Sequence, residues 1–160
     1  MAASRLNPAA QLAALALAAA VLGTLAQAFA PTRIPWREDW SAHVQTKALK
    51  LGLALAETAD AQTLSASGHA LLIDARGAKD YDAGRLPGAL SLPDSQRTEI
   101  YPLFADLFTP GQTLLIYCSG KTCDESLNLC LFLREQGHTN LVLYVGGYHA
   151  WQEAGLPVER

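Results

Sequence analysis

Short apolar segments that alternate with helix-like segments constrain the fold of this chain more than any other feature. From Leu71 onward, four segments have the length and continuous apolar character of buried strands. The predicted strands cover residues 71–76, 89–93, 113–118 and 141–145. The predicted helices cover residues 78–84, 94–108, 124–137 and 146–155. Strands that are apolar on both faces and alternate with helices predict an α/β fold, with an open parallel sheet and helices on both of its faces.

The chain divides into three predicted parts. Residues 1–30 form an apolar N-terminal helix, residues 31–50 form a linker that contains a short helix, and residues 51–160 form the globular domain. Glycine often closes a helix in the left-handed conformation, so we expect two short helices that end at Gly52 and Gly68. A further helix is expected to be interrupted by its proline.

The N-terminal part predicts contact with a membrane. No charged residue lies between Arg5 and Arg33, and residues 9–30 are long enough to span roughly 30 Å of hydrocarbon. We therefore expect a single-pass membrane anchor, with the domain on the extracytoplasmic side. A cleaved signal peptide is the alternative, because residues 26–28 (Ala-Gln-Ala) match a small-x-small cleavage site.

Charge and cysteine content exclude several classes of function. The chain has 15 acidic and 12 basic residues and no block of Lys or Arg, so we expect no nucleic-acid partner. Its three cysteines lie in one short region, an odd count that differs from a disulfide framework and favours reactivity. The histidines and cysteines lack the spacing of a metal site, and no cofactor is predicted.

Cys118 stands where a predicted strand gives way to a loop and a helix. Ligand sites of open α/β sheets form at the carboxyl ends of strands, so this thiol occupies a position typical of an active site. We expect the backbone NH groups of the following loop and the helix dipole to favour its thiolate. Gly120 permits a tight turn there, and Lys121 adds a positive charge that attracts an anion. The junction thus predicts a nucleophile combined with an anion-binding loop.

Three stretches of the sequence resemble the rhodanese (sulfurtransferase) domain, and the resemblance covers residues 51–159. They are "LLIDARGAKDYDAGRLPGALSLP", "LLIYCSGKTCDESLNLCLFLREQGHTNLVLYV" and "GGYHAWQEAGLPVE". The resemblance implies a sulfurtransferase in which Cys118 takes sulfur from a small donor such as thiosulfate or a persulfide. Cys118 would hold that sulfur as a persulfide and pass it to a thiol of a protein or small molecule. The predicted substrate-binding loop consists of Ser119, Gly120, Lys121, Thr122 and Asp124.

The loop departs from the common pattern of that family. Members often have glycine in the fourth and arginine in the sixth position of the loop, whereas this chain has glycine third and Cys123 sixth. A phosphatase of the same fold would need arginine six residues after its nucleophile. That position holds Asp124, whose charge repels phosphate, so phosphatase chemistry is not expected.

Cys123 and Cys130 receive different predictions. Cys123 can attack the persulfide and release sulfide, which leaves a disulfide with Cys118, or it can receive the sulfur as a relay. It can also be only a small residue that packs near the helix start. Cys130 shares a helix face with leucines and is predicted to pack in the core.

Several other residues are predicted to support the site. Asp74 and Arg76 match the "DAR" or "DVR" corner of the family, and we expect a structural ion pair or turn bond between them. Ser126 can donate a hydrogen bond to the sulfur or cap the helix. Gly146 and Gly147 are expected to permit a tight turn from the last strand into the last helix.

Three functional hypotheses remain open from the sequence. The first is a membrane-tethered sulfurtransferase that forms a persulfide on Cys118. The second is a redox protein that uses a reversible Cys118–Cys123 disulfide toward a thiol partner. The third is a binding module that retains the fold without catalysis.

Overall fold

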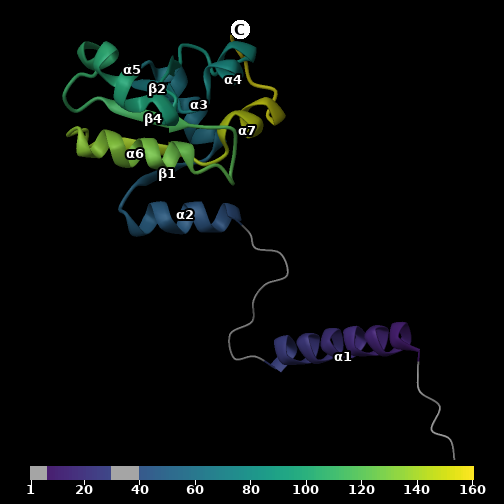
Figure 1. Ribbon diagram of the computed structural model, residues 1–160. Coiled ribbons are helices and arrows are strands. Elements are labelled where there is room, and N and C mark those ends of the chain that lie inside the picture. Colours follow the sequence, from purple (N-terminus) through teal and green to yellow (C-terminus); the bar gives the residue numbers. More distant parts are fainter. Residues whose placement is uncertain (1–6, 30–39) are drawn as a thin grey trace, which may run out of the picture. The chain divides into compact units, whose positions relative to one another are not determined.

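The computed structural model describes residues 7–29 and 40–160 of the chain, which fall into two compact units (Figure 1). The first contains one helix, α1 (Pro8–Phe29). The helices of the second are α2 (Trp40–Lys50), α3 (Thr58–Ser67), α4 (Ala78–Ala83), α5 (Arg97–Phe104), α6 (Glu125–Glu135) and α7 (Gly147–Glu153), with 3-10 turns η1 (Asp94–Gln96) and η2 (Ala105–Leu107). Its strands are β1 (Ala54–Ala56), β2 (Ala70–Asp74), β3 (Leu90–Ser91), β4 (Thr113–Tyr117) and β5 (Leu141–Tyr144).

The five strands form one parallel sheet in the order β1-β5-β4-β2-β3. β4 lies at the centre, paired with β5 on one side and β2 on the other. The predicted α/β fold with a parallel sheet is therefore confirmed. Since all strands run in the same direction, the segments that follow β2, β4 and β5 meet at one edge of the sheet.

β1 was not among the strands predicted from the sequence. It contains only Ala54, Leu55 and Ala56, residue types that favour helices in isolation. Its strand conformation comes from pairing with β5, in which Ala54 lies opposite Val142 and Ala56 lies opposite Tyr144. Tertiary pairing outweighs local propensity here.

Helices cover both faces of the sheet, as predicted. On one face, side chains of α2 and α6 pack with alternate residues of β4, namely Leu114 and Ile116. On the other face, α3 and α7 contribute Ala61 and Trp151, which pack against Leu115. Successive side chains of β4 thus point into two separate hydrophobic cores, because side chains alternate along a strand. Both cores hold the central strand in place.

Helix α2 is part of the compact unit rather than of a free linker. Val44 and Ala48 are buried among core residues of the sheet and α6. The Arg134 side chain of α6 donates a 2.8 Å hydrogen bond to the carbonyl of Leu51, just beyond the end of α2. The domain start predicted at Leu51 therefore leaves out a helix that helps to fill its core.

The helix that contains Pro102 also differs from the prediction. Pro102 lies inside α5 and does not separate two helices, and α5 ends two residues later at Phe104. The breaks in this region fall instead at η1 and η2, on either side of α5. A proline near the end of a short helix removes few hydrogen bonds, so α5 accommodates it.

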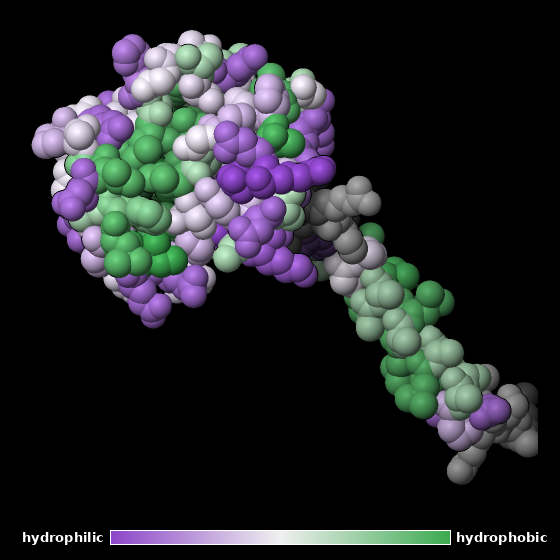
Figure 2. Space-filling view, turned by 90° about the horizontal axis from the view of Figure 1, so that it is seen from above, coloured by the Kyte–Doolittle hydropathy of each residue, from purple (hydrophilic) through white to green (hydrophobic). Residues whose placement is uncertain are grey.

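The other unit contains α1, which is long and apolar enough to cross a membrane. Its span, Pro8–Ala28, has 21 residues and a mean hydropathy of 1.9. Figure 2 shows hydrophobic residues along its length. A signal sequence near an N-terminus meets the same criteria of length and composition. Residues 31–39 of the linker predicted at 31–50 lie outside the described residues.

Candidate active site

Cys118 is the first residue after β4 and opens the loop that leads to α6. Its side chain is 1% exposed and packs in the core between the sheet and α6. From the first turn of α6, the hydroxyl of Ser126 donates a hydrogen bond of 3.2 Å to Cys118 Sγ. Ser126 thus contacts the sulfur and does not cap the helix. The first turn of α6 thus holds a hydroxyl donor against the sulfur.

The structure joins Cys118 and Cys123 in a disulfide, with the two Cα atoms 6.4 Å apart. Cys118 Sγ also lies 3.7 Å from the carbonyl oxygen of Gly120 and 3.5 Å from that of Cys123. The amide of Cys123 donates to the carbonyl of Gly120 over 3.1 Å, which folds the loop back on itself. This turn brings Cys123 next to Cys118.

In this disulfide form, the surroundings of Cys118 Sγ differ from the ring of amides expected around a thiolate. Among the described residues, no backbone NH group of the loop donates a hydrogen bond to Sγ, and carbonyl oxygens of Gly120 and Cys123 contact it instead. A sulfur in a disulfide has no net charge and does not orient NH groups as a thiolate would. Ser126 is the hydrogen-bond donor that this form retains.

Glu125 is a site residue that the sequence reasoning missed. Its carboxylate oxygen Oε2 lies 3.3 Å from Cys123 Sγ, at the surface of the domain. Partial burial raises the pKa of Glu125, and the carboxylates of Asp94, Asp80 and Asp74 raise it further. The sequence did contain a signal for this residue. Glu125 is an acidic residue two positions after a loop cysteine, in the first turn of a helix.

The beginning of α7, which follows the neighbouring strand β5, donates hydrogen bonds to the cysteine loop. The amide of Tyr148 donates to the carbonyl of Cys118 over 2.8 Å, and the amide of His149 donates to that of Ser119 over 3.0 Å. Gly147 has φ +60°, and a Cβ there would lie 2.5 Å from Cys118 O and 2.8 Å from the Gly120 nitrogen. The tight turn predicted at Gly146 and Gly147 is therefore confirmed, and it permits close contact between the two loops.

Asp74 and Arg76 form the predicted ion pair at the carboxyl end of β2. Arg76 Nη2 lies 2.6 Å from Asp74 Oδ2, and both side chains are buried. The Tyr117 hydroxyl donates to Asp74 over 2.8 Å, and Arg76 also donates to the carbonyl of Gly84 over 2.7 Å. The Arg76 guanidinium lies 4.1 Å from the ring centroid of Tyr148. The pair therefore connects β2, β4 and α7 beneath the site.

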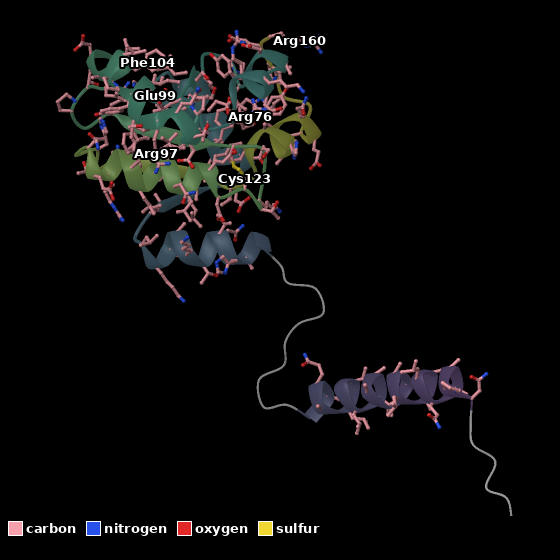
Figure 3. All side chains as sticks on the ribbon, viewed as in Figure 1. Arg76, Arg97, Glu99, Phe104, Cys123 and Arg160 are labelled. Carbon is pink, nitrogen blue, oxygen red and sulfur yellow. A yellow bond between two sulfur atoms is a disulfide. The ribbon has the colours of Figure 1, made fainter. Side chains whose placement is uncertain are left out.

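A polar cavity of about 380 Å³ opens beside the cysteine loop. Its lining includes Arg76, Asp80, Ser119, Tyr148, His149 and Gln152. Arg76 and Cys123 lie toward the same end of the domain in Figure 3. Ser119 belongs both to this cavity and to the cysteine loop, so the cavity can admit a small polar molecule to the loop.

The remaining predicted loop residues point toward solvent. Lys121, Thr122 and Asp124 are exposed, and Asp124 makes no side-chain capping bond to α6 although it holds the N-cap position. They are therefore accessible to a ligand that approaches the loop. Across residues 7–29 and 40–160, no group of three or more His, Cys, Asp or Glu residues could hold a metal ion.

Cys130 packs in the core, as predicted. It is fully buried, and burial raises the pKa of its thiol to about 12. A thiol with such a pKa stays protonated near neutral pH and is a poor nucleophile. Of the three cysteines, Cys118 and Cys123 are therefore the pair available for chemistry.

Comparison with known proteins gives relatives for the domain. A family model described as the rhodanese-like domain matches residues 57–154. Thiosulfate sulfurtransferase GlpE from Actinobacillus succinogenes is 32% identical over 91 residues, which are 57% of this chain and 77% of that protein. An HTH-type transcriptional regulator from Mycobacterium tuberculosis is 30% identical over 93 residues, and the match covers 58% of this chain and 39% of the regulator.

Solved structures share the fold. A rhodanese-related protein from Thermoplasma volcanium has a TM-score of 0.55 at 21% identity, covering 66% of this chain and 97% of that one. A thiosulfate sulfurtransferase from Pseudomonas aeruginosa has a TM-score of 0.60 at 20% identity, covering 76% of this chain and 23% of that one.

Fold and site together define a class of α/β protein in which a cysteine loop joins the central strand of a parallel sheet to a helix. The predicted resemblance is confirmed, since the family model matches more than half of the residues. The chain belongs to the rhodanese-like domain family, which is of the sulfurtransferase type.

Proposed function

We propose that the domain is a sulfurtransferase that carries sulfane sulfur as a persulfide on Cys118. The observation that supports this most is the position of Cys118 at the carboxyl end of the central strand, with the Ser126 hydroxyl 3.2 Å from its sulfur. The relative that is named a thiosulfate sulfurtransferase supports the same activity. The form with a Cys118–Cys123 disulfide is the oxidised state, and a thiol must reduce it before Cys118 can act.

The transfer consists of two displacements at sulfur. The Cys118 thiolate attacks the outer sulfur of the donor, and the donor's sulfur–sulfur bond breaks with its electron pair on the leaving group. That group is sulfite if the donor is thiosulfate, or a thiolate if the donor is a persulfide. A thiolate acceptor then attacks the outer sulfur of the Cys118 persulfide, and Cys118 leaves as a thiolate. Ser126 stabilises the negative charge on Cys118 before loading and after discharge.

Charges near the loop favour a donor with little negative charge. Asp124 and Glu125 follow Cys123 directly, whereas Lys121 is the cation of the loop itself. Like charges repel, so a dianion such as thiosulfate approaches less readily than a small persulfide. We therefore propose a low-molecular-weight persulfide as the preferred donor and a thiol as the acceptor.

Sulfur loading tests this proposal directly. The reduced protein is incubated with thiosulfate or with a small persulfide under anaerobic conditions, and its mass is then measured. We expect Cys123→Ser to gain one sulfur atom that peptide mapping places on Cys118. Cys118→Ser should gain none there. Equal loading of the two variants, or no loading of either, would contradict the proposal.

The disulfide favours a second candidate function, thiol–disulfide exchange with a partner thiol. In that case a dithiol partner would reduce the Cys118–Cys123 bond, and neither cysteine would ever hold an additional sulfur. The loading experiment separates the two functions in the Cys123→Ser variant, because a sulfurtransferase adds one sulfur atom to Cys118 there, whereas a protein that only exchanges disulfides adds none.

We also propose that α1 anchors the domain to a membrane with the domain on the extracytoplasmic side. Its 21-residue apolar span supports an anchor. Membrane fractionation of the full chain tests this: an anchored protein stays in the membrane at high salt and is released by detergent. Recovery of a shortened chain that lacks α1 would indicate a cleaved signal peptide.

A further inference from the structure

We propose that the domain also releases its bound sulfur as hydrogen sulfide, with Cys123 as the resolving thiol and Glu125 as the general base that deprotonates it. This inference rests on the proposed persulfide at Cys118 and adds a second outcome for it. It assigns a catalytic role to Glu125, which lies outside the loop predicted to bind substrate.

The path of the loop brings the two sulfurs together. The turn from Gly120 to Cys123 is closed by its own backbone hydrogen bond, and the Cα atoms of Cys118 and Cys123 are 6.4 Å apart. That separation falls within the range of about 4.4–6.8 Å that disulfides span. Cys123 can therefore reach the inner sulfur of a persulfide on Cys118 with the loop as it stands.

The two cysteines differ in exposure in the way that a resolving pair requires. Cys118 is 1% exposed, whereas Cys123 is half-buried and reaches the surface. A persulfide on the buried sulfur is shielded from many external thiols, whereas Cys123 is bonded to that same sulfur in this structure. The more exposed Cys123 sulfur is also the one that an external dithiol can attack to reopen the disulfide.

Glu125 is placed to accept the proton of Cys123. Its Oε2 atom is 3.3 Å from Cys123 Sγ, a distance at which a thiol donates a hydrogen bond to a carboxylate. Glu125 begins α6, so the helix holds its backbone at a defined distance from the loop. Partial burial and nearby carboxylates raise the pKa of Glu125, which makes it a stronger base than an ordinary glutamate.

The proposed step conserves atoms and electrons. Glu125 takes the proton from the Cys123 thiol, and the thiolate attacks Cys118 Sγ. The bond between Cys118 Sγ and the outer sulfur breaks, and its electron pair leaves with that sulfur as hydrosulfide. The products are the Cys118–Cys123 disulfide and hydrosulfide, so the outer sulfur is reduced as the two cysteines are oxidised. An external dithiol then reduces the disulfide and becomes oxidised itself.

A single-turnover experiment under anaerobic conditions tests the inference. The reduced full-length protein, in detergent, receives one equivalent of a small persulfide with no other thiol present. We expect the wild type to release about one sulfide per protein and to lose two hydrogens from its mass. Cys123→Ser should keep the added sulfur on Cys118 and release at least tenfold less sulfide over the same time.

The outcomes separate this inference from the proposed function. A stable persulfide on Cys118 of the wild type, with no sulfide, would overturn the inference and leave sulfur transfer intact. A persulfide on Cys123 would overturn it in favour of a relay. If Cys118 of the Cys123→Ser variant takes up no sulfur, the proposed function fails and this inference fails with it.

The pH profile of sulfide release tests the role of Glu125. We expect Glu125→Gln to slow release about tenfold near pH 7 and to recover toward the wild-type rate above the ordinary thiol pKa of about 8.5. Glu135→Gln, which alters an exposed glutamate at the other end of α6, is the matched control and should match the wild type. An unchanged pH profile in Glu125→Gln would show that Glu125 is not the base.

Discussion

At the scale of single residues, the buried charge of Asp74 holds several side chains in place next to the site. Its carboxylate is fully buried and accepts hydrogen bonds from the Arg76 backbone and side chain and from the Tyr117 hydroxyl. Burial and the nearby Asp74 charge raise the pKa of Tyr117, so its hydroxyl stays protonated and donates. Arg76 has no other carboxylate partner among the described ion pairs. Loss of the Asp74 charge would therefore leave a buried guanidinium uncompensated.

We predict that Asp74→Asn lowers the free energy of unfolding by about 3 kcal/mol, because breaking a buried ion pair strands the remaining charge. Urea unfolding followed by circular dichroism measures the change. Asp82→Asn, at an exposed aspartate of α4, serves as the control and should change stability by less than about 0.5 kcal/mol. A loss below about 1 kcal/mol in Asp74→Asn would refute this account of the pair.

At the scale of elements, the shape of the cysteine loop depends on α7 as much as on its own residues. Two amides at the start of α7 donate to the carbonyls of Cys118 and Ser119. Gly147 makes this contact possible, since its φ is +60° and the space where a Cβ would lie is filled by backbone atoms of the loop. The turn after β5 therefore positions the residues after β4.

Gly147→Ala and Gly155→Ala make a matched pair at the two ends of α7. Both glycines have positive φ, +60° and +66°, but only a Cβ at Gly147 would meet the cysteine loop. We predict a loss of about 1–2 kcal/mol for Gly155→Ala, from its left-handed backbone alone, and a clearly larger loss for Gly147→Ala. Only Gly147→Ala should also change the rate at which reduced Cys118 reacts with iodoacetamide. Equal effects on stability and reactivity would show that the loop contact is unimportant.

At the scale of the whole molecule, the chain contains an apolar helix and a domain. The first helix of that domain, α2, precedes the residues that the family model matches. The family model begins at residue 57, yet Val44 and Ala48 of α2 lie in the same core as Ile116 and Leu129. Burial of a valine side chain contributes about 1.5–3 kcal/mol. The compact unit therefore needs α2 for its stability.

Two truncations test where the stable domain begins. A chain that starts at residue 40 retains α2, and we predict that it is as resistant to urea as the domain of the full chain in detergent. A chain that starts at residue 51 lacks α2 and should lose at least about 2 kcal/mol of stability. Equal unfolding midpoints for the two truncations would show that α2 is dispensable.

The sequence alone determined the class of fold and the position of Cys118. Continuous apolar strands that alternate with helices require a parallel sheet covered on both faces, and this local pattern placed Cys118 at a strand end. The ion pair of Asp74 and Arg76 was likewise expected, from the resemblance of "DAR" to the motif of the family. Features that depend on residues close in sequence are readable from their periodicity and spacing.

Tertiary structure alone decided what surrounds the sulfur. The strand conformation of β1, the support of the loop by Gly147 and the packing of α2 all depend on contacts between distant parts of the chain. Even for Glu125, which lies two residues after Cys123 in the chain, the sequence did not indicate that its carboxylate turns toward Cys123 Sγ. Burial and strand pairing select these contacts, since they depend on which surfaces meet once the sheet has formed.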